Sequence, residues 1–312
     1  MFVRVFIAGH RGMVGTALQR TLPKGYELIK ATRSTLDLRD ETGVRRFLKE
    51  SMPDLIILAA ARVGGISANS RFQRQFLLEN LQIQNAVLNS AAEISVHNLI
   101  FLGSSCIYPR LAEQPIKEES LLSGPLEPTN EGYALAKIVG LKLCNAIHKD
   151  LGLNYFSLMP TNLYGPNDNY SLDDGHVPAA LMRRFHEAKI SLKKEVEVWG
   201  SGKPKREFMH VDDLANACWF LADKNLGGEL INIGTGIDIE ISAFAELMAS
   251  VVGYEGTIKL DSSKPDGSPR KLLDVTKAHN LGWQHKIELG EGLKSTYRWF
   301  TNSLEKGEVR GY

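Results

Sequence analysis

The first half of the chain alternates continuous apolar runs with stretches of helical periodicity. Strand-like runs occupy residues 2–8, 54–60 and 98–103, and few polar residues interrupt them. Strands that are covered on both faces have this composition, as a parallel sheet requires. The alternation predicts right-handed βαβ units and an α/β fold with a doubly wound parallel sheet of the Rossmann type. Further strands are expected at 27–30 and 154–159, and helices up to residue 22 and at 40–51, 75–94 and 130–149.

The strict alternation fades in the second half of the chain. A helix at 177–188 and strands at 196–199 and 230–234 are still predicted there. We therefore expect a nucleotide-binding domain over residues 1–162, with a later return strand near 208–234. Residues 163–312 are expected to form mainly a smaller, mixed α/β substrate domain, and the chain crosses between the two.

Composition and charge exclude several classes of partner. The 312 residues are 43% apolar and 23% charged, with a net charge of +1, so no overall field favours nucleic acid or an anionic membrane. No apolar run approaches the ~20 residues of a membrane helix, and Met1 leads directly into a strand, which leaves no room for a signal peptide. Three cysteines are an odd, sparse set that favours a reducing cytoplasm over a disulfide framework. No metal site is predicted.

A glycine-rich turn follows the first strand and opens the first helix. Its sequence is Gly9-His10-Arg11-Gly12-Met13-Val14-Gly15. Glycines permit a tight turn and close approach of a phosphate to the backbone, and a helix N-terminus favours negative charge. The spacing Gly-x-x-Gly-x-x-Gly at this place therefore predicts a dinucleotide site.

Two arginines favour NADP(H) as the dinucleotide. Domains that prefer NAD usually carry an acidic residue at the end of the second strand, where this chain has Arg33. Together with Arg11 it can hold a 2′-phosphate through charge-assisted hydrogen bonds. Asp37 is then placed to reach the adenine, and the small Ala60 and Ala61 let a flat cofactor lie against the backbone.

Candidate catalytic residues follow the fourth strand and begin the 130–149 helix. Tyr133 and Lys137 are four residues apart and share a helix face, and a nearby ammonium lowers the pKa of a phenol. Such a pair can exchange a proton with a carbonyl or an alcohol. Ser104 and Cys106 end the fourth strand, and strand ends are where ligands bind in such sheets. Cys144 and Cys218 lie in helical runs and are expected to be packing residues.

These motifs resemble the extended short-chain dehydrogenases/reductases and, within them, the GDP-L-fucose synthase family. The resemblance rests on the glycine turn and on four further stretches that extend almost to the end of the chain: Gly103 to Pro109, Glu127 to Lys137, Met159 to Pro166 and Pro265 to Asp274. It implies epimerisation of GDP-4-keto-6-deoxy-D-mannose at C3 and C5, followed by reduction of the C4 ketone by NADPH to give GDP-L-fucose.

The resemblance also implies roles for individual residues. Cys106 is implied as the epimerising base and His176 as the acid, while Ser104 and Tyr133 hold the C4 oxygen and Lys137 grips the nicotinamide ribose. The remaining cofactor contacts that it implies are Leu38, Pro160, Leu163 and His176. Arg206 and Lys271 supply charge for a diphosphate or ribose and Trp199 a flat face for guanine, and the resemblance adds Val177, Leu181 and Arg184.

Other functions remain open at this stage. A sugar-nucleotide 4,6-dehydratase would carry a carboxylate after the catalytic Ser, where this chain has Ser105 and Cys106, and a 4-epimerase would carry an acidic residue at Arg33. A non-catalytic NADP-binding sensor would typically lack Tyr133 or Lys137, and both are present. On the resemblance, the 75–94 and 130–149 helices are expected to pair two copies into a homodimer.

Overall fold

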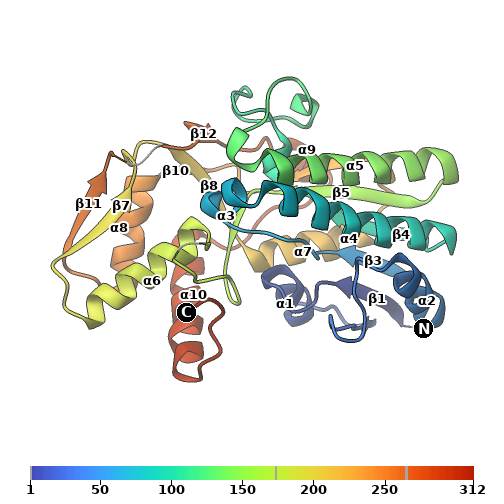
Figure 1. Ribbon diagram of the computed structural model, residues 1–312, viewed down its shortest axis with the longest axis horizontal. Coiled ribbons are helices and arrows are strands. Elements are labelled where there is room, and N and C mark those ends of the chain that lie inside the picture. Colours follow the sequence, from blue (N-terminus) through green and yellow to red (C-terminus); the bar gives the residue numbers. More distant parts are fainter. Residues whose placement is uncertain (1, 173, 264–265) are drawn as a thin grey trace.

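A six-stranded parallel sheet lies at the centre of the larger of two units in the computed structural model, which describes residues 2–172, 174–263 and 266–312 (Figure 1). The predicted doubly wound parallel sheet is therefore confirmed. Its strands, in spatial order, are β2 (Tyr26–Ile29), β1 (Val3–Ala8), β3 (Leu55–Leu58), β4 (Asn98–Leu102), β5 (Asn154–Pro160) and β9 (Leu230–Ile233).

The strand order reverses at β1. From β1 the chain moves outward to β2 and then returns to β3 on the other side of β1. In open parallel sheets, ligands bind at such a reversal, beyond the carboxyl ends of the strands. The glycine turn, which follows β1, and Ala60, which follows β3, flank this point.

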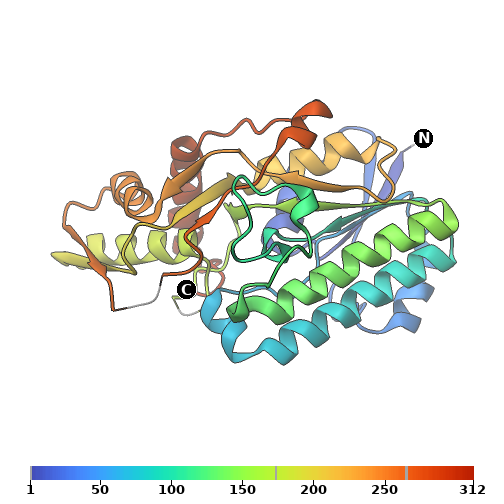
Figure 2. The ribbon, with the colours of Figure 1, turned by 90° about the horizontal axis from the view of Figure 1, so that it is seen from above.

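Helices cover both faces of the sheet. One face is covered by α1 (Met13–Arg20), α7 (Val211–Ala222) and the short α9 (Thr276–Asn280), and its core contains Leu18, Leu214 and Ala278. The other face is covered by α2 (Glu41–Ser51), α4 (Gln73–Glu93) and α5 (Glu131–Leu151). Figure 2 shows α4 and α5 side by side along this face. The predicted helices at 40–51, 75–94 and 130–149 are thus confirmed, while α3 (Ile66–Arg71) was not predicted.

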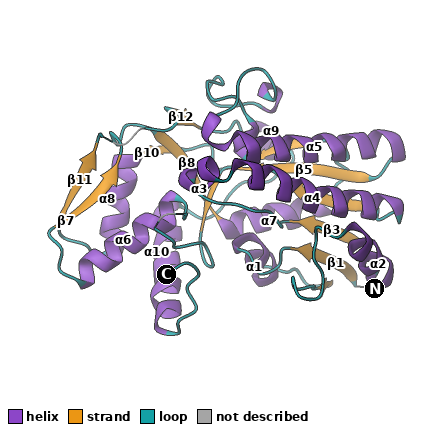
Figure 3. Ribbon diagram, viewed as in Figure 1, coloured by secondary structure: helices purple, strands orange, loops and turns teal. Residues whose placement is uncertain are grey.

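A smaller unit lies beyond the carboxyl edge of the sheet (Figure 3). Its central strand, β8 (Lys205–His210), pairs with β6 (Asn162–Tyr164), β10 (Asp238–Glu240) and β12 (Arg270–Lys271). A separate pair consists of β7 (Glu195–Trp199) and β11 (Thr257–Asp261). The helices α6 (Val177–Ile190), α8 (Ile241–Val252) and α10 (Leu289–Glu305) enclose a third hydrophobic core.

The chain passes several times between the two units. Only Thr161 separates β5 of the large sheet from β6 of the small one, and β8 runs directly into α7, which packs on the large sheet. Within the described residues, no helix combines the length and the hydropathy needed to cross a membrane.

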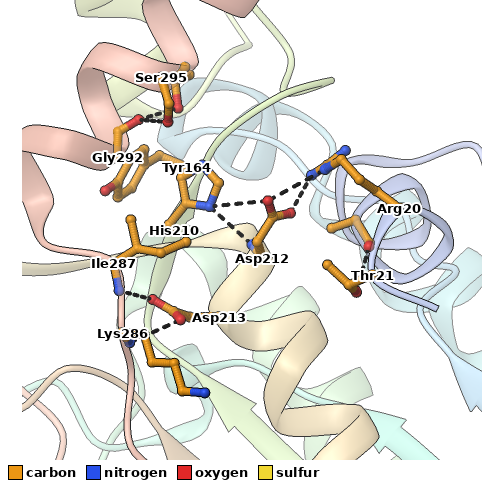
Figure 4. A network of polar contacts seen from close by, with 12 residues as sticks. Arg20, Thr21, Tyr164, His210, Asp212, Asp213, Lys286, Ile287, Gly292 and Ser295 are labelled. Atoms are coloured by element: carbon orange, nitrogen blue, oxygen red, sulfur yellow. Dashed lines mark hydrogen bonds and ion pairs between the residues drawn. The ribbon is translucent and has the colours of Figure 1, made fainter. Parts of the chain in front are cut away.

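The first turn of α7 ties these segments together (Figure 4). Asp212 pairs with Arg20 of α1, and its backbone N–H donates to Nδ1 of His210 (3.2 Å). The carboxylate of Asp213 accepts hydrogen bonds from the backbone N–H groups of Lys286 and Ile287, each at 3.0 Å. This helix end is therefore anchored both to α1 and to the segment that leads into α10.

Glu207 connects more distant segments from inside the small sheet. Its side chain is fully buried, and Oε1 accepts hydrogen bonds from the N–H groups of Thr235 (2.6 Å) and Gly236 (2.8 Å). Its other oxygen, Oε2, accepts from the N–H of Leu273 (3.0 Å). Its backbone carbonyl accepts from Asn162 (2.8 Å). One residue thus joins β6, β8, the turn after β9 and the segment after β12.

We predict that Glu207→Gln lowers the free energy of unfolding by about 1–3 kcal/mol. The amide keeps one oxygen for Thr235 and Gly236, but an N–H₂ donor then faces the N–H of Leu273. Urea unfolding followed by circular dichroism measures the change. Glu197→Gln is the matched control, because Glu197 is exposed on β7, and it should change stability by less than about 0.5 kcal/mol. Equal effects of the two substitutions would contradict the role assigned to Glu207.

Candidate active site

The glycine turn forms a close-fitting cradle at the end of β1. Gly9 has φ +95°, and a Cβ placed there would lie 2.7 Å from the backbone nitrogen of Ala60. A Cβ on Gly15 would lie 2.2 Å from the carbonyl oxygen of Gly9. Gly12 immediately precedes α1, and the first turn of this helix, which includes Met13 and Val14, contains no acidic residue. The cradle therefore presents backbone and a positive helix end, which suits a phosphate group.

Arg11, within the glycine turn, and Arg33, after β2, are both exposed. Neither makes an ion pair in the part of the chain that the structure describes. Asp37 is engaged differently from the expectation, because its carboxylate accepts from Arg39 Nη2 at 2.7 Å. Hydrogen bonds from Arg39, with a smaller contribution from the Arg33 charge, lower the pKa of Asp37 to about 2. The carboxylate that was expected to reach an adenine is thus paired with Arg39.

The other expected cofactor contacts lie at the same edge of the sheet. Ala60 and Ala61 lie just after β3, beyond Ala59, and are partly buried. Pro160 is the last residue of β5, where it pairs with Ile233, and Leu163 lies in β6. Leu38 is also partly buried and packs on the core beneath α2.

A short 3₁₀ turn over Ser105–Ile107 presents Ser104 and Cys106 (η1). Ser104 has an extended backbone, and its hydroxyl oxygen accepts a hydrogen bond from the N–H of Cys106 (3.2 Å). The Cys106 sulfur, in turn, accepts from Asn130 Nδ2 (3.2 Å) and Lys271 Nζ (3.4 Å). Burial raises the pKa of the thiol, but the Lys271 charge and these hydrogen bonds outweigh it and hold the pKa below its ordinary value.

Tyr133 and Lys137 face the same site from α5, but not with the expected electrostatics. The Lys137 ammonium donates to the carbonyl of Leu102 (2.7 Å) and lies 5.9 Å from the centre of the Tyr133 ring. Burial raises the pKa of Tyr133, the neighbouring Cys106 raises it further, and a hydrogen bond with Ser104 lowers it only in part. The prediction that Lys137 lowers the pKa of Tyr133 is therefore wrong, because burial of the phenol raises that pKa by more. Burial also lowers the pKa of Lys137, to about 8.

His176 immediately precedes α6, a helix of the smaller unit. It is exposed, and the loop before it is fixed to the large unit by a hydrogen bond from the Gly65 N–H to the carbonyl of Asp174 (2.9 Å). Asp168 is buried nearby, attracts His176 electrostatically, and its Oδ2 has no partner among the described residues. Within the described residues, no hydrogen bond or ion pair links His176 to Cys106.

The expected substrate-binding residues occupy the small unit. Trp199 is 53% exposed, and the guanidinium of Arg184 lies 5.0 Å from the centre of its ring. Arg206 is partly buried on β8 and is attracted to Asp266 and Cys106. Val177 is exposed on α6, whereas Leu181 is only 4% exposed and packs into the third core. Leu181 therefore presents little surface to a ligand.

Among the described residues that hydrogen-bond to the Cys106 sulfur, Asn130 is the one for which the sequence predicted no role. It precedes α5 and lies three residues before Tyr133, inside the stretch that carries the resemblance. Its amide donates to the sulfur, and its Oδ1 is buried without a partner in the described part of the chain. A polar side chain at a helix start is usually a cap, so residue type alone could not reveal this contact.

The site combines three features: a Rossmann-type sheet, a glycine cradle at the point where the strand order reverses, and a Ser-Tyr-Lys group at the carboxyl edge of the sheet. Together they define a nucleotide-binding oxidoreductase of the extended short-chain dehydrogenase/reductase class. Residues 5–234 match the NAD dependent epimerase/dehydratase family. The chain belongs to this family, and the predicted resemblance is confirmed.

Individual relatives narrow the comparison. The chain is 52% identical to "Probable GDP-L-fucose synthase 1" of Oryza sativa subsp. japonica over 96% of this chain and 93% of the relative. It is 50% identical to the GDP-L-fucose synthase of Escherichia coli (strain K12), over 97% and 98% of the two chains. The solved structure of a GDP-L-fucose synthetase from Naegleria fowleri bound to NADP is 27% identical, with a TM-score of 0.90 over 98% and 94% of the two chains.

We predict that Lys137→Met raises the free energy of unfolding near pH 7 by about 1–2 kcal/mol. Burial lowers the pKa of Lys137 to about 8 in the folded protein, so the ammonium opposes folding below that pH. Between about pH 8 and about pH 10.5, Lys137 is protonated in the unfolded chain but not in the folded protein. The free energy of unfolding of the wild type therefore rises over this range, and its difference from that of the variant disappears.

Urea unfolding near pH 7 and about pH 9.5 measures both effects. Lys142→Met is the control, because Lys142 is exposed on the same helix, and its effect should stay below about 0.5 kcal/mol at both pH values. A Lys137→Met variant that is less stable than the wild type near pH 7 would contradict the prediction that the buried ammonium lowers the free energy of unfolding.

Proposed function

We propose that this protein converts GDP-4-keto-6-deoxy-D-mannose to GDP-L-fucose, by epimerisation at C3 and C5 and NADPH-dependent reduction at C4. The observation that carries the proposal is the position of Cys106. Its sulfur accepts hydrogen bonds from Asn130 and Lys271 and lies in the same cluster as Ser104 and Tyr133. A proton-abstracting group therefore lies beside a reductase pair, and no carboxylate follows Ser104 to support a dehydratase.

The residues at the sheet edge fit NADP(H). Phosphate groups would lie on the backbone of Gly9 to Gly12 and at the start of α1, and Arg11 and Arg33 would hold a 2′-phosphate. Lys137 would hold the nicotinamide ribose. The bound cofactor supplies hydride to C4. The NADP-bound relative from Naegleria fowleri supports this assignment.

Epimerisation uses the acidity of the protons that flank a ketone. The Cys106 thiolate takes a proton from C3 or C5, and the hydroxyls of Ser104 and Tyr133 stabilise the oxygen on C4 as negative charge develops there. His176 returns a proton on the opposite face of the sugar. In this assignment the two groups reach the sugar from different units of the protein, Cys106 from the end of β4 and His176 from the start of α6.

Reduction then requires a proton on the same C4 oxygen. Tyr133 is suited to supply it, because burial and the neighbouring Cys106 raise the pKa of Tyr133 and keep the phenol protonated at neutral pH. The same hydroxyl thus stabilises the oxygen during epimerisation and protonates it after hydride transfer. The GDP moiety would lie in the small unit, with Arg206 near the diphosphate and Trp199 beside the guanine.

The first experiment is the oxidation of NADPH, followed by absorbance, with GDP-4-keto-6-deoxy-D-mannose as substrate. We expect turnover to GDP-L-fucose, faster with NADPH than with NADH because Arg11 and Arg33 hold the 2′-phosphate. In D₂O the product should carry deuterium at C3 and C5. Binding of NADPH without turnover would overturn the proposed substrate and leave the cofactor site standing.

Cys106→Ser is the informative variant for this reaction. It should abolish most deuterium incorporation at C3 and C5, while reduction of the C4 ketone remains possible. Cys144→Ser is the matched control, since Cys144 is buried in α5 and lies outside the cluster. A normal rate of GDP-L-fucose formation by Cys106→Ser would show that Cys106 is not the base.

We also propose that α4 and α5 pair with the same helices of a second copy in the cytoplasm. Leu78, Leu135 and Val139 are 46%, 39% and 44% exposed on these adjacent helices, which suits a helical dimer interface.

Light scattering of the protein in solution should give twice the 34.6 kDa of the chain. Val139→Arg should give monomer, whereas Leu192→Arg, at a residue 87% exposed elsewhere, should leave the dimer intact. A wild-type monomer would disprove the pairing.

A further inference from the structure

The ammonium of Lys271 lies against the sulfur of Cys106 instead of against a carboxylate. Lys271 Nζ is 3.4 Å from Sγ and reaches it from a strand 165 residues further along the chain. Lys271 forms no ion pair with Asp or Glu among the described residues. Asn130 contacts the same sulfur at 3.2 Å from the start of α5. Two donors from distant segments therefore converge on one sulfur atom.

The backbone around Lys271 is fixed on both sides. In β12, Lys271 pairs with Arg206 of β8. The next residue, Leu272, receives a hydrogen bond from the N–H of Ile116 (2.8 Å) and donates to Gln114 Oε1 (2.9 Å). After it, Leu273 donates to the buried Glu207. This network places the root of the Lys271 side chain and limits where the ammonium can go.

Among the residues that the structure describes, three titratable or charged groups face Cys106 from the elements packed around it. They are Lys271 on β12, Arg206 on β8 and Tyr133 on α5. Of these three groups, only Lys271 combines a hydrogen bond to the sulfur with a positive charge. Arg206 divides its attraction among Asp266, Cys106 and Glu127, and Tyr133 is neutral at ordinary pH.

We infer that Lys271 is a positioning residue for the proposed epimerisation, in which its ammonium holds the Cys106 sulfur as a thiolate aimed, together with Asn130, at the substrate. Lys271 keeps its own proton throughout. The thiol releases a proton to solvent before the substrate reacts, the sulfur accepts the proton from carbon, and His176 supplies the proton that returns to carbon. This role rests on the proposed function, and it differs from the phosphate contact that the sequence suggested for Lys271.

The test measures the pH dependence of Cys106 alkylation by iodoacetamide in the full chain without substrate. Cys144 and Cys218 are buried, so Cys106 is the thiol expected to react in the folded protein, and peptide mass spectrometry confirms the site. Wild-type protein should react with a midpoint below the ~8.5 of a free thiol. Lys271→Met should shift the midpoint upward and slow the reaction near pH 7 by about tenfold or more.

Two further variants separate charge from structure. Lys271→Arg keeps the charge and should restore most of the low-pH reactivity, and Lys203→Met removes an exposed lysine of the same unit and should leave the profile unchanged. Near-ultraviolet circular dichroism verifies that each variant is folded. A Lys271→Met profile that overlays the wild type would overturn the inference, as would failure of Lys271→Arg to restore reactivity when both variants are folded.

Turnover then separates this inference from the proposed function. If the proposed function is right, Lys271→Met lowers kcat and deuterium incorporation and shifts the acidic limb of the pH–rate profile to higher pH. Loss of a phosphate contact alone would instead raise KM and leave the acidic limb unchanged. The alkylation result stands on its own, because it needs no substrate. A shifted alkylation profile in a protein that does not turn over this substrate would retain the Lys271–Cys106 pair and reject the proposed reaction.

Discussion

The buried carboxylate of Glu207 is the constraint on which the arrangement of the two units depends. A carboxylate removed from water is costly unless hydrogen-bond donors replace the water. Three backbone N–H groups do so here, two from the turn after β9 and one from Leu273. Because these donors belong to segments far apart in the sequence, satisfying one side chain fixes where the chain crosses between the units. The same bond to Leu273 helps to fix the backbone from which the Lys271 side chain reaches Cys106.

Electrostatics at the proposed site separate two proton-transfer tasks that would otherwise conflict. A base must be deprotonated at neutral pH, and the Lys271 charge beside Cys106 favours that state. A proton donor must stay protonated, and burial together with the neighbouring sulfur favours that state for Tyr133. The thiolate therefore helps to keep Tyr133 protonated, since negative charge on the sulfur opposes loss of the proton from the phenol oxygen. Ser104 contacts both groups and couples them.

The parts of the fold that the sequence predicted are those with a local signal. Continuous apolar runs identified β1, β3 and β4, and helical periodicity identified α2, α4 and α5. The small sheet was missed because β6, β10 and β12 have two or three residues each, too few for any periodicity, and are held by pairing with β8. Site residues beside a strand end were predicted for the same local reason. The contact between Lys271 and Cys106 spans 165 residues, and no local pattern encodes it.

Burial also explains why one electrostatic expectation failed. Helical spacing places Tyr133 and Lys137 on one face, but it does not say how much water each group loses. In the folded protein Lys137 is 4% exposed and donates to the carbonyl of Leu102, so its own charge is penalised, and the cost of burying a phenolate exceeds any help that it gives to Tyr133. Tyr133 must be protonated to act as the proton donor in the reductive step. The burial that raises its pKa, contrary to the prediction from helical spacing, therefore suits the proposed chemistry.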